Sequence, residues 1–161
     1  MLFADLTGFT AFSEGRDAED VREMLSEYFE ISRRIVASYA GRIEKFIGDA
    51  VMALWGAPVA HEDDAERAVR AALDLVAAVT GLGDTLGVEL RVRVGVLTGH
   101  AAVELGAVAE GMVIGDAINT ASRIQSVAQP GTVLVDDVTR AVTNQAIAYE
   151  DAGAHTVKGK T

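Results

Sequence analysis

The sequence predicts an α+β fold, a ferredoxin-like βαββαβ sandwich with additional strands and a helix appended. Three observations support this expectation. The chain of 161 residues has the length of one domain, and 50% of its residues are hydrophobic, enough to bury a core. Segments with strand and helix periodicity also follow one another in the order strand, helix, hairpin, helix, strand. We therefore expect residues 1–161 to form a single domain.

The first half of the chain carries a strand, a helix and a hairpin. Residues 1–4 form a short apolar strand. Residues 17–39 begin with an aspartate that can cap a helix and then repeat apolar residues at spacings of three and four, the pattern of an amphipathic helix. Residues 42–55 alternate about a central Gly48-Asp49 pair, which predicts two antiparallel strands joined by a tight hairpin with Asp49 at its tip.

The second half supplies the remaining helices and strands. Residues 62–79 carry an apolar stripe and have acidic residues in the first turn, which predicts a second helix packed on the same sheet. A strand, a helix and a strand are expected over residues 90–96, 115–128 and 131–135. In the first of these strands Arg91 and Arg93 alternate with apolar residues and are expected to point outward.

Composition excludes several classes of protein. A net charge of −10 repels the phosphate backbone and argues against nucleic acid as a partner. The absence of cysteine excludes disulfides, thiol catalysis and thiolate zinc sites. The most apolar stretch, residues 50–60, contains Gly56 and Pro58, so no membrane span is expected. The start of the chain does not resemble a signal peptide, and a cytoplasmic location is the expectation.

The first informative motif is Phe-Ala-Asp-Leu-Thr-Gly-Phe-Thr at residues 3–10. It places the carboxylate of Asp5 at a strand end, followed by a turn that contains Gly8 and two threonines. Such a turn can direct backbone N–H groups at an anion while the carboxylate holds a hard cation beside it. A solvated turn capped by the aspartate is the alternative interpretation.

Asp49 is informative only in combination with Asp5. By itself a Gly-Asp pair is an ordinary hairpin turn. In a ferredoxin-like sheet, however, the first strand and the hairpin strands are neighbours, so Asp5 and Asp49 can meet at one edge. Two carboxylates that close repel each other unless a divalent cation lies between them.

A third motif covers residues 115–123. Asn119 and Arg123 are four residues apart and share one face of the expected helix, opposite its apolar stripe. A solvated helix face is one interpretation. The fixed fork of an arginine can instead bind phosphoryl oxygens.

Together these motifs resemble the class III adenylyl and guanylyl cyclase catalytic domain, in its bacterial form. The resemblance rests on residues 3–10, on Lys-Phe-Ile-Gly-Asp at 45–49 and on Ile-Gly-Asp-Ala-Ile-Asn-Thr-Ala-Ser-Arg at 114–123, and it spans nearly the whole chain. The first motif lies almost at Met1, and the family normally has a strand after residues 157–160. The sequence is therefore interpreted as a catalytic domain excised from a longer protein with regulatory domains.

The resemblance implies a two-metal site for nucleotide cyclisation. Asp5 and Asp49 would bind two divalent cations, Mg²⁺ or Mn²⁺, with the backbone carbonyl of Leu6 assisting. These cations would activate the ribose 3′-hydroxyl for in-line attack on the α-phosphate and neutralise the triphosphate. The phosphates would lie against the turn formed by Leu6, Thr7, Gly8, Phe9 and Thr10. Asn119 and Arg123 would orient the ribose and stabilise the transition state.

The same resemblance bears on substrate choice. Lys45 occupies the purine-selecting position, which is lysine in adenylyl cyclases, because adenine N1 accepts a hydrogen bond. The second base-reading position, Asp or Thr in most adenylyl cyclases, falls on Met112, whose thioether is a weak acceptor. We expect weakened discrimination between bases. Lys158 or Lys160 resembles the lysine that grips the triphosphate.

The predicted function is an adenylyl cyclase that converts ATP to cyclic AMP and pyrophosphate. The family forms head-to-tail dimers in which one chain supplies the metal aspartates and the other supplies the Asn and Arg residues, which implies a homodimer with two shared sites. A catalytically weak or degenerate domain that binds nucleotide or serves regulatory dimerisation is the alternative. A diguanylate cyclase lacks support, since its glycine-and-acid hairpin is absent, and a pure interaction module would show no dependence on divalent metal.

Overall fold

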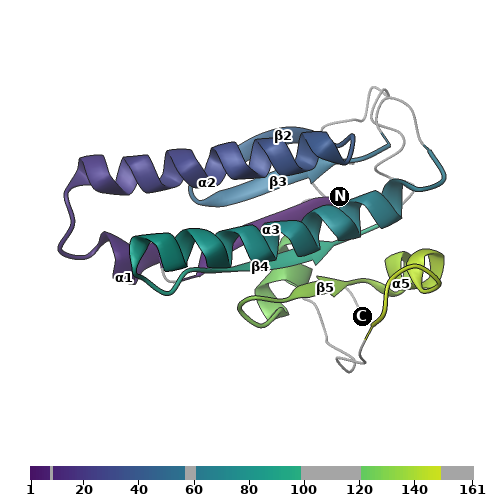
Figure 1. The fold of residues 1–161 in the computed structure, drawn as a ribbon. Helices are drawn as coiled ribbons and strands as arrows, with labels where there is room; N and C mark the ends of the chain where they lie inside the picture. The colour runs from purple at the N-terminus through teal and green to yellow at the C-terminus, as the bar shows by residue number, and fades with distance from the viewer. Residues whose placement is uncertain (8, 57–60, 99–120, 150–161) are drawn as a thin grey trace.

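The fold is an α+β sandwich in which the residues that the structure describes form a five-stranded sheet (Figure 1). A computed structural model of the chain describes residues 1–7, 9–56, 61–98 and 121–149. The elements are β1 (Leu2–Thr7), α1 (Phe9–Ser13), α2 (Ala18–Ser38), β2 (Arg42–Ile47), β3 (Ala50–Leu54), α3 (Asp64–Leu86), β4 (Arg91–Val96), β5 (Val133–Val135) and α5 (Asp137–Thr143). A further helical segment covers residues 121–127.

The strand order confirms the predicted topology. The sheet runs β2-β3-β1-β4-β5. Its first four strands pair antiparallel, and β5 lies parallel to β4. This is the order that a βαββαβ chain adopts when each helix returns across the same face of the sheet. Accordingly, α2 and α3 contact each other and lie side by side over the sheet in Figure 1.

The two faces of the sheet are covered differently. Alternate residues of the strands face α2 and α3 and form the main core with them: Leu2, Ala4, Leu6, Val51, Ala53, Val92, Val94 and Val96. The intervening residues form a second cluster, to which the helical segment at 121–127 contributes Ala121: Met1, Phe3, Ala50, Met52 and Leu54. The segment at 121–127 therefore packs on the face opposite to α2 and α3.

Several element boundaries differ from the prediction. The helix expected over residues 62–79 continues to Leu86, because its buried stripe extends through Val79 and Gly83, and it ends at Gly87 in the left-handed conformation with φ 73°. Two short helices, α1 and α5, were not predicted. Asp17 occupies the N-cap position of α2, but its side chain makes no capping hydrogen bond.

The first motif also has a different shape from the one expected. The strand was predicted to end at Asp5 and to be followed by a turn from Leu6 to Thr10. In the structure β1 continues to Thr7, because β4 pairs with it as far as Arg91, and α1 begins at Phe9. The predicted bounds of the turn, Leu6 to Thr10, are therefore wrong, since Leu6 and Thr7 belong to the strand and Phe9 belongs to the helix.

The buried hydroxyl group of Tyr28 leads to a prediction about the stability of the fold. The Tyr28 side chain is fully buried, and its hydroxyl has no hydrogen-bond partner within the residues that the structure describes. An unpartnered buried polar group costs about 1 kcal/mol or more. We expect Tyr28→Phe to raise the free energy of unfolding by about 1 kcal/mol in urea denaturation.

A matched tyrosine provides the control. The Tyr39 hydroxyl donates a hydrogen bond of 2.6 Å to the Asp74 carboxylate at the surface, so Tyr39→Phe should be neutral or slightly destabilising. A loss of stability in Tyr28→Phe would show that its hydroxyl is satisfied in solution.

Candidate active site

The structure brings Asp5 and Asp49 together at one edge of the sheet, as the strand order predicts. Asp5 lies on β1 directly opposite Ala50 of β3, and Asp49 lies in the turn that precedes Ala50. Gly48 shapes that turn with φ 60°. The Asp49 side chain and the Leu6 backbone lie close enough to Asp5 to influence the ionisation of its carboxyl group.

The electrostatics of the pair suit a divalent cation. Burial, the hydrogen bond to Asp49 and the Asp49 charge raise the pKa of Asp5 from 3.8 to about 6, while Arg93 opposes this increase. A cation bound between the two carboxyl groups would relieve the unfavourable interaction that raises the pKa of Asp5. Carboxylate oxygens are the ligands that Mg²⁺ and Mn²⁺ prefer. Within the described segments, no cluster of three or more Asp, Glu, His or Cys side chains forms a metal site.

Arg93 joins the site without having been predicted. It lies on β4 directly opposite Asp5, and its Nε atom is buried with no hydrogen-bond partner among the residues described. The alternation of β4 predicts that the Arg93 side chain points outward, and in the structure it is half-buried on the face that bears Asp5. An unpartnered guanidinium nitrogen beside two carboxylates can bind a phosphoryl oxygen.

Lys45 shares this face of the sheet. It lies on β2 opposite Met52 of β3, and Met52 lies opposite Phe3 of β1. Residues directly opposite each other project to the same side, and Asp5 is two residues beyond Phe3 on the same strand. Lys45 therefore projects on the Asp5 side of the sheet, where it is exposed.

Arg123 lies on the helical segment that packs over this same face. Ala121, Ile124 and Ala128 are buried, as the predicted apolar stripe requires, and Arg123 is half-buried. Gln125 is also buried, which its polar side chain does not predict.

The other predicted site residues fall into two groups. Leu6 packs in the main core, the Thr7 hydroxyl donates a hydrogen bond of 3.2 Å to the Arg91 carbonyl, and Phe9 is half-buried against the main core. The second group lies outside the described residues: Gly8, Met112, Asn119, Lys158, Lys160 and the side chain of Thr10.

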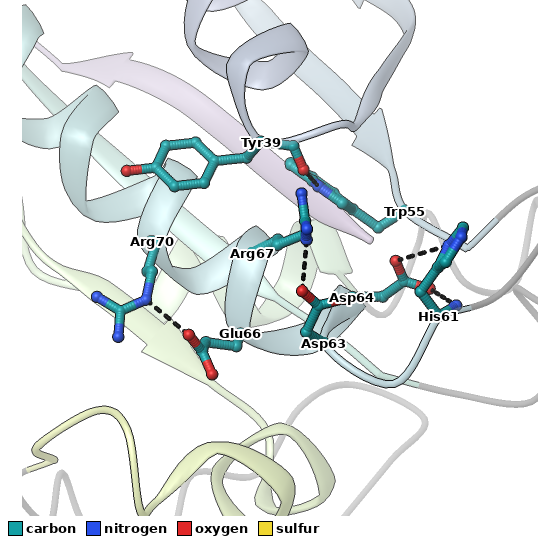
Figure 2. Close-up of polar contacts among 8 residues, drawn as sticks. All are labelled: Tyr39, Trp55, His61, Asp63, Asp64, Glu66, Arg67 and Arg70. Atoms are coloured by element: carbon teal, nitrogen blue, oxygen red, sulfur yellow. Dashed lines mark hydrogen bonds and ion pairs between the residues drawn. The ribbon is translucent and has the colours of Figure 1, made fainter.

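At the opposite end of the sheet, the end of α2 contacts Trp55, the residue that follows β3. The Trp55 indole donates a hydrogen bond of 2.9 Å to the Tyr39 carbonyl, as Figure 2 shows. A Cβ atom on Gly41 would overlap the Trp55 ring, so only glycine fits there.

Exposed ion pairs line the first turns of α3, Arg67 with Asp63 at 2.7 Å and Arg70 with Glu66 at 2.9 Å (Figure 2). Surface pairs of this kind contribute little to stability.

Comparison with known proteins identifies the relatives of the chain. The family model described as the adenylate and guanylate cyclase catalytic domain matches residues 1–161. Adenylate cyclase 1 of Rhizobium meliloti is 36% identical over 99% of this chain, and the rat guanylate cyclase soluble subunit beta-2 is 31% identical over 99%. The chain spans 25% and 24% of the lengths of these two relatives.

Solved structures agree with this relationship. The adenylyl cyclase CyaB from P. aeruginosa superposes with a TM-score of 0.82, is 26% identical and covers 98% of this chain and 86% of its own. The catalytic core of a rhodopsin-guanylyl cyclase with converted specificity, in complex with ATPαS, has a TM-score of 0.80, is 25% identical and covers 99% of this chain and 87% of its own. None of the helices within the described segments has the length and apolarity that a membrane span requires. The chain belongs to the class III adenylate and guanylate cyclase catalytic domain family.

Proposed function

We propose that this chain is an adenylyl cyclase catalytic domain that converts ATP to cyclic AMP and pyrophosphate. The observation that carries the proposal is the Asp5–Asp49 pair with Arg93 beside it, whose Nε atom has no hydrogen-bond partner among the described residues, on a sheet face that also bears Lys45. The relatives include both adenylate and guanylate cyclases, so the choice of ATP rests on Lys45.

The proposed chemistry assigns a task to each residue of the site. Bound Mg²⁺ or Mn²⁺ would supply Lewis-acid activation of the ribose 3′-hydroxyl and neutralise the triphosphate. Asp5 and Asp49, with the Leu6 carbonyl, would hold two such cations in each site. Arg93 would pair with phosphate oxygens of the nucleotide. The ribose 3′-hydroxyl would give its proton to solvent water and its oxygen would bond to the α-phosphorus, while the bond from that phosphorus to the oxygen bridging to the β-phosphate would break and pyrophosphate would leave.

The remaining site residues would be supplied by the partner chain. In the proposed head-to-tail homodimer, Arg123 and Asn119 of one chain complete the site that contains Asp5 and Asp49 of the other. Lys45 and Met112 would contact the base, and Lys158 or Lys160 the triphosphate. The backbone N–H groups from Thr7, the last residue of β1, to Thr10 would be offered to the phosphates.

Direct assay of the purified domain tests this function. ATP or GTP is incubated with Mn²⁺ or Mg²⁺, and cyclic products are separated from linear ones. Cyclic AMP as the main product supports the proposal. Cyclic GMP in excess would favour a guanylyl cyclase, a second candidate kept open by Met112 and by the guanylate cyclase relative. Nucleotide binding without turnover would indicate the degenerate alternative.

Substrate choice should depend on the charge at Lys45. If its ammonium group donates to adenine N1, ATP should be preferred over GTP by roughly 1.5–3 kcal/mol, or about one to two decades in kcat/KM. We expect Lys45→Glu to move the preference toward GTP, since the N1–H of guanine is a donor. The switch should be incomplete, because Met112 offers guanine no polar partner.

Two further variants make this test specific. Arg42→Glu changes an exposed cation on the same strand, where Arg42 pairs with Glu44 at 3.2 Å, and should leave the ATP/GTP ratio unchanged. Met112→Thr introduces an acceptor for the adenine amine and should raise the ratio. If Met112→Thr left the ratio unchanged or reduced it, position 112 would not read the base.

A further inference from the structure

A second feature of the proposed site is the contact between β4 and the helical segment at residues 121–127. A Cβ atom placed on Gly95 would lie 2.7 Å from the Gln125 backbone nitrogen, 2.9 Å from the Ala121 carbonyl oxygen and 3.1 Å from the Gln125 Cα. Ala121 and Gln125 are four residues apart, so the Gln125 backbone nitrogen and the Ala121 carbonyl oxygen are the donor and the acceptor positions of one turn of an α-helix. The backbone of that turn therefore rests on the strand with no side chain between them.

This turn is the one that carries Arg123. It is anchored by Ala121, which is fully buried, and by Gln125, which is 4% exposed. On the strand side, Gly95 lies opposite Phe3 of β1, and the next pair on the same face is Asp5 opposite Arg93. The depth at which the turn sits on Gly95 thus sets the position of Arg123 relative to its own sheet.

We propose that Gly95 is a positioning residue for the cyclisation reaction, one whose missing side chain fixes the depth of the Arg123 turn. This inference rests on the proposed function. An alanine at position 95 would have to move the turn outward by about 0.5–1 Å to restore ordinary contact distances. Misplacement of a catalytic group by about 1 Å can lower a rate by about 100-fold.

Another glycine provides a matched control for packing damage. A Cβ atom on Gly83 of α3 would lie 2.8 Å from the Val88 carbonyl oxygen and 2.9 Å from the Leu90 backbone nitrogen. Gly83 is buried like Gly95 and would also meet backbone atoms, but it lies on the helix layer across the sheet from Arg123. Gly83→Ala should therefore cost stability without moving Arg123.

The first measurement separates turnover from stability. The kcat, KM and free energy of unfolding are measured for the wild type, Gly95→Ala and Gly83→Ala under conditions in which each protein is folded. We expect Gly95→Ala to lower kcat by about 10- to 100-fold with KM within about threefold of wild type. Gly83→Ala should keep the wild-type kcat. A Gly95→Ala variant with wild-type kcat, or one whose kcat falls no further than that of Gly83→Ala, would overturn the inference.

The second measurement uses the shared sites of the dimer. A heterodimer of an Asp49→Ala chain with an Arg123→Ala chain has one intact site, whose Arg123 comes from the Asp49→Ala chain. Adding Gly95→Ala to that chain should lower activity at least about tenfold more than adding it to the other chain. Equal losses from the two placements would contradict a role in positioning Arg123.

A variant on the helix covers the case in which Gly95→Ala fails to fold. Ala121→Val overpacks the same contact from the other side, because Ala121 is fully buried in the cluster that contains Phe3 and Met52. It should show the same loss of kcat and the same dependence on the chain that carries it, and wild-type behaviour would overturn the inference. A wild-type domain that cyclises neither nucleotide would instead overturn the proposed function, so the two failures are distinguishable.

Discussion

Replacing Asp5 or Asp49 by asparagine is expected to reduce cyclic nucleotide formation by about three orders of magnitude or more, while the domain stays folded. An amide keeps the shape of the carboxyl group but removes the negative charge that would hold a divalent cation, and several kcal/mol of charge stabilisation are lost with it. The measurement is the rate of cyclic AMP formation at saturating Mn²⁺, with circular dichroism as the check on folding.

The same substitution at Asp5 should stabilise the metal-free domain. Because folding raises the pKa of Asp5 from 3.8 to about 6, the protonated carboxyl is favoured in the folded state, and stability falls as pH rises through about 6. The amide of the variant carries no charge that burial and Asp49 could penalise. Allowing for the partial exposure of the pair, we expect Asp5→Asn to gain about 1 kcal/mol at pH 8 in EDTA, and no gain below about pH 4.

An exposed aspartate provides the control for both measurements. Asp84 lies on the surface of α3, and Asp84→Asn should change neither activity nor the pH dependence of stability. Asp5→Asn with near wild-type cyclisation would contradict the two-metal assignment. If Asp5→Asn were less stable than the wild type at pH 8 without metal, Asp5 and Asp49 would not repel each other in the folded domain.

The sequence was sufficient to predict the sheet and the aspartate pair. Apolar alternation located the strands, and the order of strands and helices implied that β1 and β3 are neighbours, which brings Asp5 beside Asp49. Both inferences depend on local periodicity and on connection rules that apply to any chain of this pattern. Capping chemistry could have located α5 as well, since the Asp136 side chain accepts a hydrogen bond of 3.1 Å from the Thr139 N–H.

What the sequence could not predict depends on strand register and on contacts through space. The role of Arg93 in the site could not be predicted, because it depends on Arg93 lying opposite Asp5. The register between β1 and β4 that places them opposite each other has no signal in the local sequence. For the same reason β1 extends two residues beyond the predicted strand end. From the sequence alone, Gly95 could mark a bulge or a bend in the strand. Its contact with the segment at 121–127 shows why a side chain is excluded there.

Complementation between inactive chains is the sharpest test of the shared site. Asp49→Ala and Arg123→Ala should each be inactive as homodimers, because every site then lacks one of the two groups. Mixing equal amounts and allowing chains to exchange gives about half heterodimers, each with one intact site of two, so about a quarter of the wild-type activity should return.

The control mixture combines two substitutions of residues that the same chain supplies to a site, Asp5→Ala and Asp49→Ala. In a heterodimer of Asp5→Ala with Asp49→Ala, each site contains one damaged pair, because both aspartates of a site come from one chain. This mixture should stay inactive although it exchanges chains equally well. Chains with distinct affinity tags allow the heterodimer to be purified before the assay. Recovery in both mixtures, or in neither once heterodimers are isolated, would contradict a site shared between Asp5 and Asp49 of one chain and Arg123 of the other.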